Sequence, residues 1–166
     1  MRAARPGRAT SARPALSIKA QAIRLLARRE YGRAELAAQL RARGGDAEAI
    51  EHALDELTAQ GYLSDRRYAD ALVHSRRGQF SRRAIAHELR SRGVADDAAR
   101  GALDSLTAGE ELAEATALWT RRYGTAPRDE REKARQVRFL LSRGYSLSVA
   151  LRVLRASGAR VDDESG

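Results

Sequence analysis

The chain has 166 residues, a formal net charge of +9 and no cysteine. The lack of cysteine excludes disulfides, thiolate catalysis and thiolate zinc sites, and the sequence has no apolar run long enough to cross a bilayer. Nearly all basic residues are arginines, with lysine only at Lys19 and Lys133. This excess of positive charge predicts an anionic partner, either a nucleic acid or an acidic protein surface.

The first 15 residues predict a disordered basic arm, because they hold two prolines, no acid and the arginines Arg2, Arg5, Arg8 and Arg13. The positive charges are not followed by the apolar core of a secretory signal, so we expect a cytoplasmic protein. Through the rest of the chain, apolar residues recur at three- and four-residue spacing and nowhere alternate with period two. The sequence therefore predicts an all-α fold.

Residues 16–61 are predicted to form a first unit of three short helices. Ser17 can cap the first helix, since its hydroxyl can accept from a free N–H of the first turn. The second helix covers about residues 33–43, and Gly44 supplies the left-handed residue that closes it. Asp46 can cap the third helix.

Residues 62–107 predict a second unit on the same plan. Ser64 can cap its first helix and Ser81 its middle helix, and Gly93 closes the middle helix as Gly44 does in the first unit. We therefore expect the two units to fold alike.

A third unit is predicted at residues 108–156, followed by a flexible acidic tail at 157–166. Its middle helix, roughly 128–143, is expected to be longer than its counterparts. It carries four arginines at spacings of three and four residues, Arg128, Arg131, Arg135 and Arg138. Residues at these spacings share one helix face.

The units are copies of one another. Segment 36–57 aligns without a gap on segment 85–106, at an offset of 49 residues, and a weaker third copy covers 140–154. Repetition at this length is typical of small helical units that stack in a row and share cores with their neighbours. We predict an elongated array of three three-helix repeats, in a protein that is a monomer.

Arginine pairs cluster on the first helices of units two and three and on the adjacent turns. Together with the four arginines of the long middle helix, they are our candidate docking face. The alternative for each pair is a solvated helix face or a bridge to an acid such as Asp70, Glu88 or Asp129, and such surface bridges contribute little. The paired residues are Arg66, Arg67, Arg76, Arg77, Arg82, Arg83, Arg121 and Arg122.

An enzyme is the least supported class of function. The three histidines, His52, His74 and His87, occupy unrelated helix positions, and Ser91 stands where a second metal ligand would have to follow His87. The sequence has no glycine-rich phosphate loop that ends in Lys-Ser or Lys-Thr. We expect no catalysis, no metal and no cofactor.

A helix-turn-helix regulator is a closer rival. Helix 47–60 would then enter the major groove, but its outward residues Glu48, Glu51, Asp55 and Glu56 would face phosphates. No two-stranded wing follows. A regulator that acts directly on nucleic acid, through a helix-turn-helix-like unit or through phosphate contacts, remains the alternative function.

Four stretches carry a resemblance to a known family: LLARREYGRAELAAQLRARG, LDELTAQGYLSDRRYADALV, AIAHELRSRGV and FLLSRGYSLSVALRVL. Together they resemble the RecX family of recombination regulators across roughly residues 16–156. The second stretch joins two units and is the most specific, through Gly61, Tyr62, Leu63, Asp65, Arg67, Tyr68 and Ala69. Many members have Gly-Pro before the middle helix of unit two, where this chain has Phe80 and Ser81.

The resemblance implies a regulatory protein that binds the RecA recombinase, mainly as its filament on single-stranded DNA. Such a protein would lie in the helical groove of the filament like a wedge. It would inhibit the ATPase, strand-exchange and coprotease activities, and so modulate DNA recombination, DNA repair and the SOS response. The resemblance implies no cofactor.

Overall fold

The computed structural model describes residues 16–106 and 110–163, with side chains up to residue 158. In these ranges every regular element is a helix, which confirms the all-α prediction. The helices are α1 (Ile18–Leu26), α2 (Arg33–Ala42), α3 (Ala47–Ala59), α4 (Asp65–Arg76), α5 (Arg82–Ser91), α6 (Asp96–Leu103), α7 (Glu111–Arg122), α8 (Glu130–Ser142) and α9 (Leu147–Asp163). None of them is long and apolar enough to span a bilayer.

The predicted capping residues begin the helices as expected. Ser17, Asp46, Ser64 and Ser81 each accept a hydrogen bond from the backbone N–H three residues further on, at 3.1 to 3.2 Å. A side-chain cap of this kind satisfies one of the N–H groups that have no partner within the helix. The capping residues therefore set the start of α1, α3, α4 and α5.

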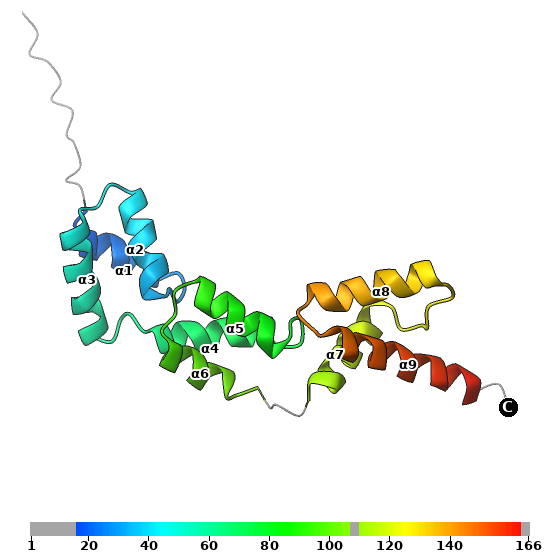
Figure 1. Cartoon of the computed structure of the whole chain (residues 1–166). Helices are drawn as coiled ribbons and strands as arrows, with labels where there is room; N and C mark the ends of the chain where they lie inside the picture. Colours follow the sequence, from blue (N-terminus) through cyan, green and yellow to red (C-terminus); the bar gives the residue numbers. More distant parts are fainter. Residues whose placement is uncertain (1–15, 107–109, 164–166) are drawn as a thin grey trace, which may run out of the picture.

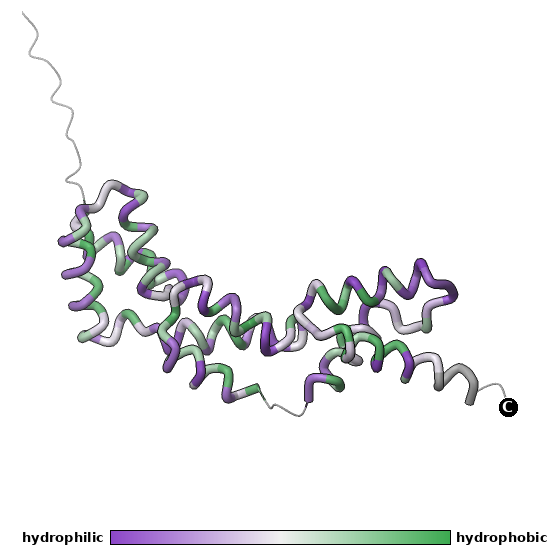
Figure 2. The backbone as a smooth tube through the Cα atoms, viewed as in Figure 1, coloured by the Kyte–Doolittle hydropathy of each residue, from purple (hydrophilic) through white to green (hydrophobic). Residues whose placement is uncertain are grey.

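Each group of three consecutive helices encloses its own apolar cluster. The first centres on Leu36, Leu40 and Leu54, the second on Ile85 and Leu89, and the third on residues such as Trp119 and Leu140. Figure 2 shows hydrophobic residues recurring along the helices, whereas the N-terminal half of α8 is hydrophilic. Each core is small, so we expect a single repeat to be marginally stable without its neighbours.

The three groups lie in a row and form an elongated, bent array (Figure 1). The middle helices α2, α5 and α8 follow one edge of the row, and the third helices α3 and α6 follow the opposite edge (Figure 1). Within residues 16–106 and 110–158, neighbouring groups meet through a small set of residues at each junction. These residues therefore have unusual weight in setting the shape.

Two glycines make the same contact at the two junctions. Gly93 and Gly144 each follow the middle helix of their unit with φ of +72° and +89°. A Cβ on Gly93 would lie 2.8 Å from Ala34 Cβ of the preceding unit, and a Cβ on Gly144 would lie 2.5 Å from Ala84 Cβ. The turn of one unit therefore packs directly on the first turn of the preceding unit's middle helix.

The structure differs from two boundaries that the sequence predicts and does not describe a third. The basic arm at 1–15 lies outside the described residues. The sequence predicts the long middle helix from residue 128, but α8 begins at Glu130 behind the cap Asp129, so Arg128 precedes the helix. The sequence also predicts a flexible tail from residue 157, whereas the backbone of α9 remains helical as far as Asp163.

The packing of Gly144 predicts a large cost for a side chain there. Gly144→Ala should lower the free energy of unfolding by the strain of a left-handed alanine, about 1–2 kcal/mol, plus the cost of separating the two units. Gly44→Ala is the matched control, because Gly44 has a φ of +82° and nothing within 4 Å of the added Cβ. Chemical denaturation of both variants should show the larger decrease for Gly144. Equal decreases would show that the close approach contributes nothing.

A buried tyrosine gives a second prediction. Tyr145 is 2% exposed, its hydroxyl has no hydrogen-bond partner among the described residues, and burial raises its pKa to about 12. Tyr145→Phe should raise the free energy of unfolding by about 1 kcal/mol, because it removes an unsatisfied buried group. Tyr68→Phe should lower it, because the Tyr68 hydroxyl accepts from Arg92 Nη1 at 3.1 Å. A loss of stability in Tyr145→Phe would contradict the first expectation.

Candidate docking surface

The junction between the first two units depends on residues of the GYLSDRRYA motif. Gly32 stands at the N-cap of α2 and offers no side-chain cap. Asp65 of α4 supplies the missing acceptor, since Arg33 N–H donates to its Oδ1 at 2.7 Å. Tyr68 packs on Gly32, where an added Cβ would come within 3.0 Å of its ring. Two motif residues thus hold α4 against the start of α2.

A polar network surrounds the Tyr68 hydroxyl. Arg92 donates to Tyr68 and to Glu88, and Glu88 also accepts from Arg76 at 2.9 Å. The bonds from Arg76 and Arg92 hold the pKa of Glu88 below its usual value. Across the junction, the bond from Arg29 likewise lowers the pKa of Glu35. Arg76, predicted as a docking residue, therefore ties α4 to α5.

Arg66 and Arg67 also have structural contacts. Arg67 bonds Glu30 of the first unit at 2.8 Å and the carbonyl oxygen of Tyr62 at 3.1 Å. Arg66 reaches Asp70 and the carbonyl oxygen of Gly101 in α6. Both side chains are about half exposed, and both guanidinium groups already have a carboxylate partner.

The remaining motif residues lie in or next to the connection between α3 and α4. Gly61 has a φ of +77°, while Leu63 and Ala69 are buried at 2% and 0% exposure. Tyr62 differs, because its side chain is 57% exposed. The most family-specific stretch is therefore chiefly a joint between units.

The second junction lies at the turn that holds Phe80 and Ser81. Ser81 is completely buried, and its N–H donates to the carbonyl oxygen of Arg143 at 2.9 Å. The Arg143 guanidinium lies 5.0 Å from the ring centre of Phe80 and 5.3 Å from that of Phe139. Arg121 of α7 adds a bond to the carbonyl oxygen of Gly78. This turn is therefore where unit three docks on unit two.

A groove of about 450 Å³ opens beside this junction. Its wall from unit two carries Arg82 and Arg83, and its wall from unit three carries Glu111 and Glu114. Arg82 bonds the carbonyl oxygens of Leu103 and Leu106 at the end of α6. Burial raises the pKa of Glu114, while the charge of Arg77 opposes that rise.

The predicted arginines therefore fall into two groups. Those already engaged by a carboxylate or a backbone carbonyl are Arg66, Arg67, Arg76, Arg82, Arg121 and Arg135, the last at 3.8 Å from Glu132. The others are exposed, and their guanidinium groups have no carboxylate within 4 Å in the described part of the chain; we call them the open arginines. They are Arg77, Arg83, Arg122, Arg128, Arg131 and Arg138.

The structure brings only part of this group together. Arg131 and Arg138 lie on one face of α8, with Arg135 between them. Arg77 and Arg83 lie near the groove between units two and three. Arg122 ends α7, where its guanidinium is 5.7 Å from the ring centre of Tyr123. The open arginines thus follow units two and three instead of forming one compact patch.

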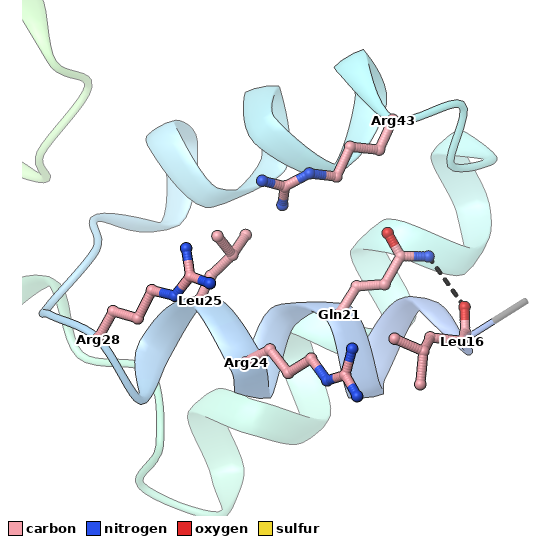
Figure 3. A pocket seen from close by; sticks show the side chains of 6 residues that line it. All are labelled: Leu16, Gln21, Arg24, Leu25, Arg28 and Arg43. Carbon is pink, nitrogen blue, oxygen red and sulfur yellow. Dashed lines mark hydrogen bonds between the residues drawn. The ribbon is translucent and has the colours of Figure 1, made fainter.

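Sequence reasoning missed a cluster in unit one. Arg24, Arg28 and Arg43 line a pocket beside Leu25 (Figure 3). One signal was present, because Arg43 recurs as Arg92 and Arg143 in the copies. Recurrence alone indicates a shared scaffold as readily as a binding residue, so it does not single out Arg43.

Metal chemistry finds no support in residues 16–106 and 110–163. No three of their histidine and acidic side chains converge in the way that a metal ion requires. His52, His74 and His87 are all exposed and lie on separate helices.

Three family models match the three units in order. Residues 19–57 match the model described as RecX, first three-helix domain; residues 64–103 match the second three-helix domain, and residues 109–154 the third. The regulatory protein RecX of Leptothrix cholodnii is 46% identical over 93% of this chain and 98% of its own. That of Ralstonia nicotianae is 37% identical over 91% and 94%.

Solved structures show the same fold. The crystal structure of RecX from Lactobacillus salivarius superposes with a TM-score of 0.67 and covers 86% of this chain and 95% of its own. Its identity to this chain is 19%. A second RecX crystal structure gives a TM-score of 0.66 at 22% identity, over 82% and 72% of the two chains.

The Glu88 network predicts a dependence of stability on pH. The pKa of Glu88 is lower in the folded chain than its usual value of 4.5, so the network stabilises the fold above that pH and no longer does so once the pH falls through the folded-state pKa. Between about pH 5 and 3, Glu88→Gln should therefore lose less stability than the parent chain. Urea unfolding at several pH values measures this difference. Glu48→Gln is the control, since no ion pair of Glu48 exists in the described residues.

Parallel curves for the parent and Glu88→Gln would show that the network carries no pH-dependent stability. A flatter curve for Glu48→Gln as well would point to general charge repulsion instead of the Arg76 and Arg92 contacts.

Proposed function

This chain belongs to the RecX family of regulatory proteins, and on that premise we propose that it is a non-catalytic regulator of the RecA recombinase. It binds the recombinase mainly as its filament on single-stranded DNA. Its binding inhibits the ATPase, strand-exchange and coprotease activities of the filament. The protein needs no cofactor, acts in the cytoplasm and works as a monomer.

One observation carries this proposal: exposed arginines without a carboxylate partner in the described residues extend along units two and three of an elongated array. A single exposed ion pair contributes only about 0.2–1 kcal/mol. An array that spans neighbouring subunits of a polymer adds such contacts together, because each formed contact raises the effective concentration of the next. A large periodic partner with acidic side chains therefore fits this surface better than a small ligand does.

The junctions support a wedge-like action. Asp65 and Tyr68 fix unit two on unit one, and Ser81 and Arg143 fix unit three on unit two. A bound array whose units are held together in this way resists a change in the spacing of the subunits beneath it. Nucleotide turnover and strand exchange that require such a change would slow.

The rival function, in which α3 enters the major groove of DNA and recognises its base sequence, has less support. Its outward acids bind basic residues of its own unit: Lys19 contacts Glu56 at 2.6 Å, and Arg33 contacts Glu51 and Asp55 at 2.8 Å. These carboxylates still stand on the face that would meet phosphates, and burying them against DNA would cost free energy.

The open arginines of α8 predict a measurable decrease in inhibition. The parent protein at substoichiometric amounts should reduce the DNA-dependent ATP hydrolysis of recombinase filaments. Arg131→Glu/Arg138→Glu should weaken this inhibition about 5- to 30-fold, because it removes two ion pairs that stabilise the complex by about 1–2 kcal/mol in total. Arg152→Glu/Arg155→Glu makes the same charge change on α9, where both residues are exposed, and should retain inhibition.

Thermal unfolding of both double variants tests whether the fold is intact. The recombinase proposal is wrong if the parent protein leaves ATP hydrolysis unchanged with both preformed and growing filaments. If the α8 and α9 variants lose inhibition equally, the docking face lies elsewhere or only net charge matters.

A further inference from the structure

Unit one contains a pocket of about 320 Å³ between α1 and α2 (Figure 3). Such a volume is at the lower end of the range for small-ligand sites, roughly 300–1,000 Å³. The residues that line it are Leu16, Gln21, Arg24, Leu25, Arg28 and Arg43.

The three guanidinium groups of the pocket have no carboxylate within 4 Å in the described residues, and no acid lines it. Acids are nevertheless close in sequence. Arg29 has a carboxylate partner, Glu35, at 2.7 Å, and the acids of α3 contact other basic residues of the unit. In unit one the acids therefore pair with other basic residues, and the three guanidinium groups without a carboxylate partner lie together at the pocket.

The ends of the two helices offset only part of this charge. Arg24 is in the last turn of α1, and Arg43 is the C-cap of α2. Each helix C-terminus is equivalent to about −0.5 of a charge. Two helix ends against three guanidinium groups leave a local charge of about +2. Favourable helix-end interactions therefore do not account for all three arginines.

The repeat provides an internal comparison for Arg43. Its copy Arg92 bonds Tyr68 and Glu88, and its copy Arg143 lies over two phenylalanine rings. Among the described residues Arg43 has neither kind of partner, and it faces the pocket instead (Figure 3). The same position is structural in two units and open in the first.

The rest of the lining is apolar or accepts hydrogen bonds. Leu16 and Leu25 supply methyl groups, and Leu16 is 41% exposed. Gln21 Nε2 donates to the Leu16 carbonyl oxygen at 2.9 Å, which leaves the amide oxygen pointing into the space between α1 and α2 (Figure 3). The ligand should therefore combine an anion with an apolar surface and a donor.

We propose that this pocket binds single-stranded nucleic acid, with backbone phosphates on the arginines and a sugar or base face on the leucines. A nucleotide combines all three features that the lining requires. The sequence before Leu16 carries Arg2, Arg5, Arg8 and Arg13 and no acid. An anion with several phosphates therefore matches the charge of this part of the sequence better than a single nucleotide does. The pocket has no aromatic ring in its lining on which bases could stack, so binding is insensitive to base sequence.

Fluorescence anisotropy with a labelled oligothymidylate and the full chain, with no recombinase present, tests the site separately from the regulatory function. Arg24→Gln/Arg28→Gln/Arg43→Gln should weaken binding about tenfold at moderate salt. The slope of log affinity against log salt should become shallower by about 0.7 for each phosphate that the variant no longer binds, or by up to about 2 in total. Arg90→Gln/Arg152→Gln/Arg155→Gln removes the same charge from exposed positions on α5 and α9 and should change both quantities little.

Equal decreases in the two triple variants would overturn the proposal, because net charge alone would then explain binding. Poly-L-glutamate is the competitor that tests for an acidic peptide. If it displaces the oligonucleotide, and if its own binding depends on the three arginines more strongly than oligonucleotide binding does, the pocket binds an acidic peptide instead. If the triple variant unfolds, Arg24→Gln alone replaces it, since Arg24 is exposed; an unchanged salt slope in that variant also refutes the site.

Discussion

The close approach of one unit's turn to the preceding unit's middle helix sets the shape of this protein. Gly93 on Ala34 and Gly144 on Ala84 leave no room for a side chain. Both glycines also adopt a left-handed backbone conformation, so the chain's turn and the contact between units require the same residue. Because each unit has only a small core of its own, these contacts and the bonds around them decide how the array is held together.

The two junctions use different chemistry around this common contact. At the first, Asp65 accepts from the first N–H of α2, whose N-cap is Gly32, and Tyr68 packs on that glycine. At the second, Ser81 caps its own helix, and its backbone N–H bonds the next unit. The second junction also borders the open groove. Polar contacts therefore close the first junction, whereas at the second junction opposite charges face each other across a groove.

Arginine serves two purposes in this chain, and its partners separate them. A guanidinium group can bond several acceptors at once, so Arg66 or Arg82 can tie a helix to carbonyl oxygens of another helix. The guanidinium groups of the open arginines form no such bond in the described residues. The regulatory proposal places that partner on units two and three, whereas the pocket of unit one has a different lining and fits a nucleic acid strand. The two surfaces lie on different units of the array.

The amino-acid sequence by itself determined the all-α class, the repeat period and the starts of most helices, because caps, left-handed glycines and apolar spacing act within a few residues of each other. It also carried the family resemblance, through a junction whose residues are mostly structural. It could not separate Arg76 from Arg77, or Arg82 from Arg83, because adjacent residues point in different directions and meet acids or carbonyl groups far away in the chain. Nor did it reveal the pocket of Arg24, Arg28 and Arg43, which forms where two helices meet. Only tertiary structure decides which charges are neutralised, since an ion pair depends on distance in space and not on distance along the chain.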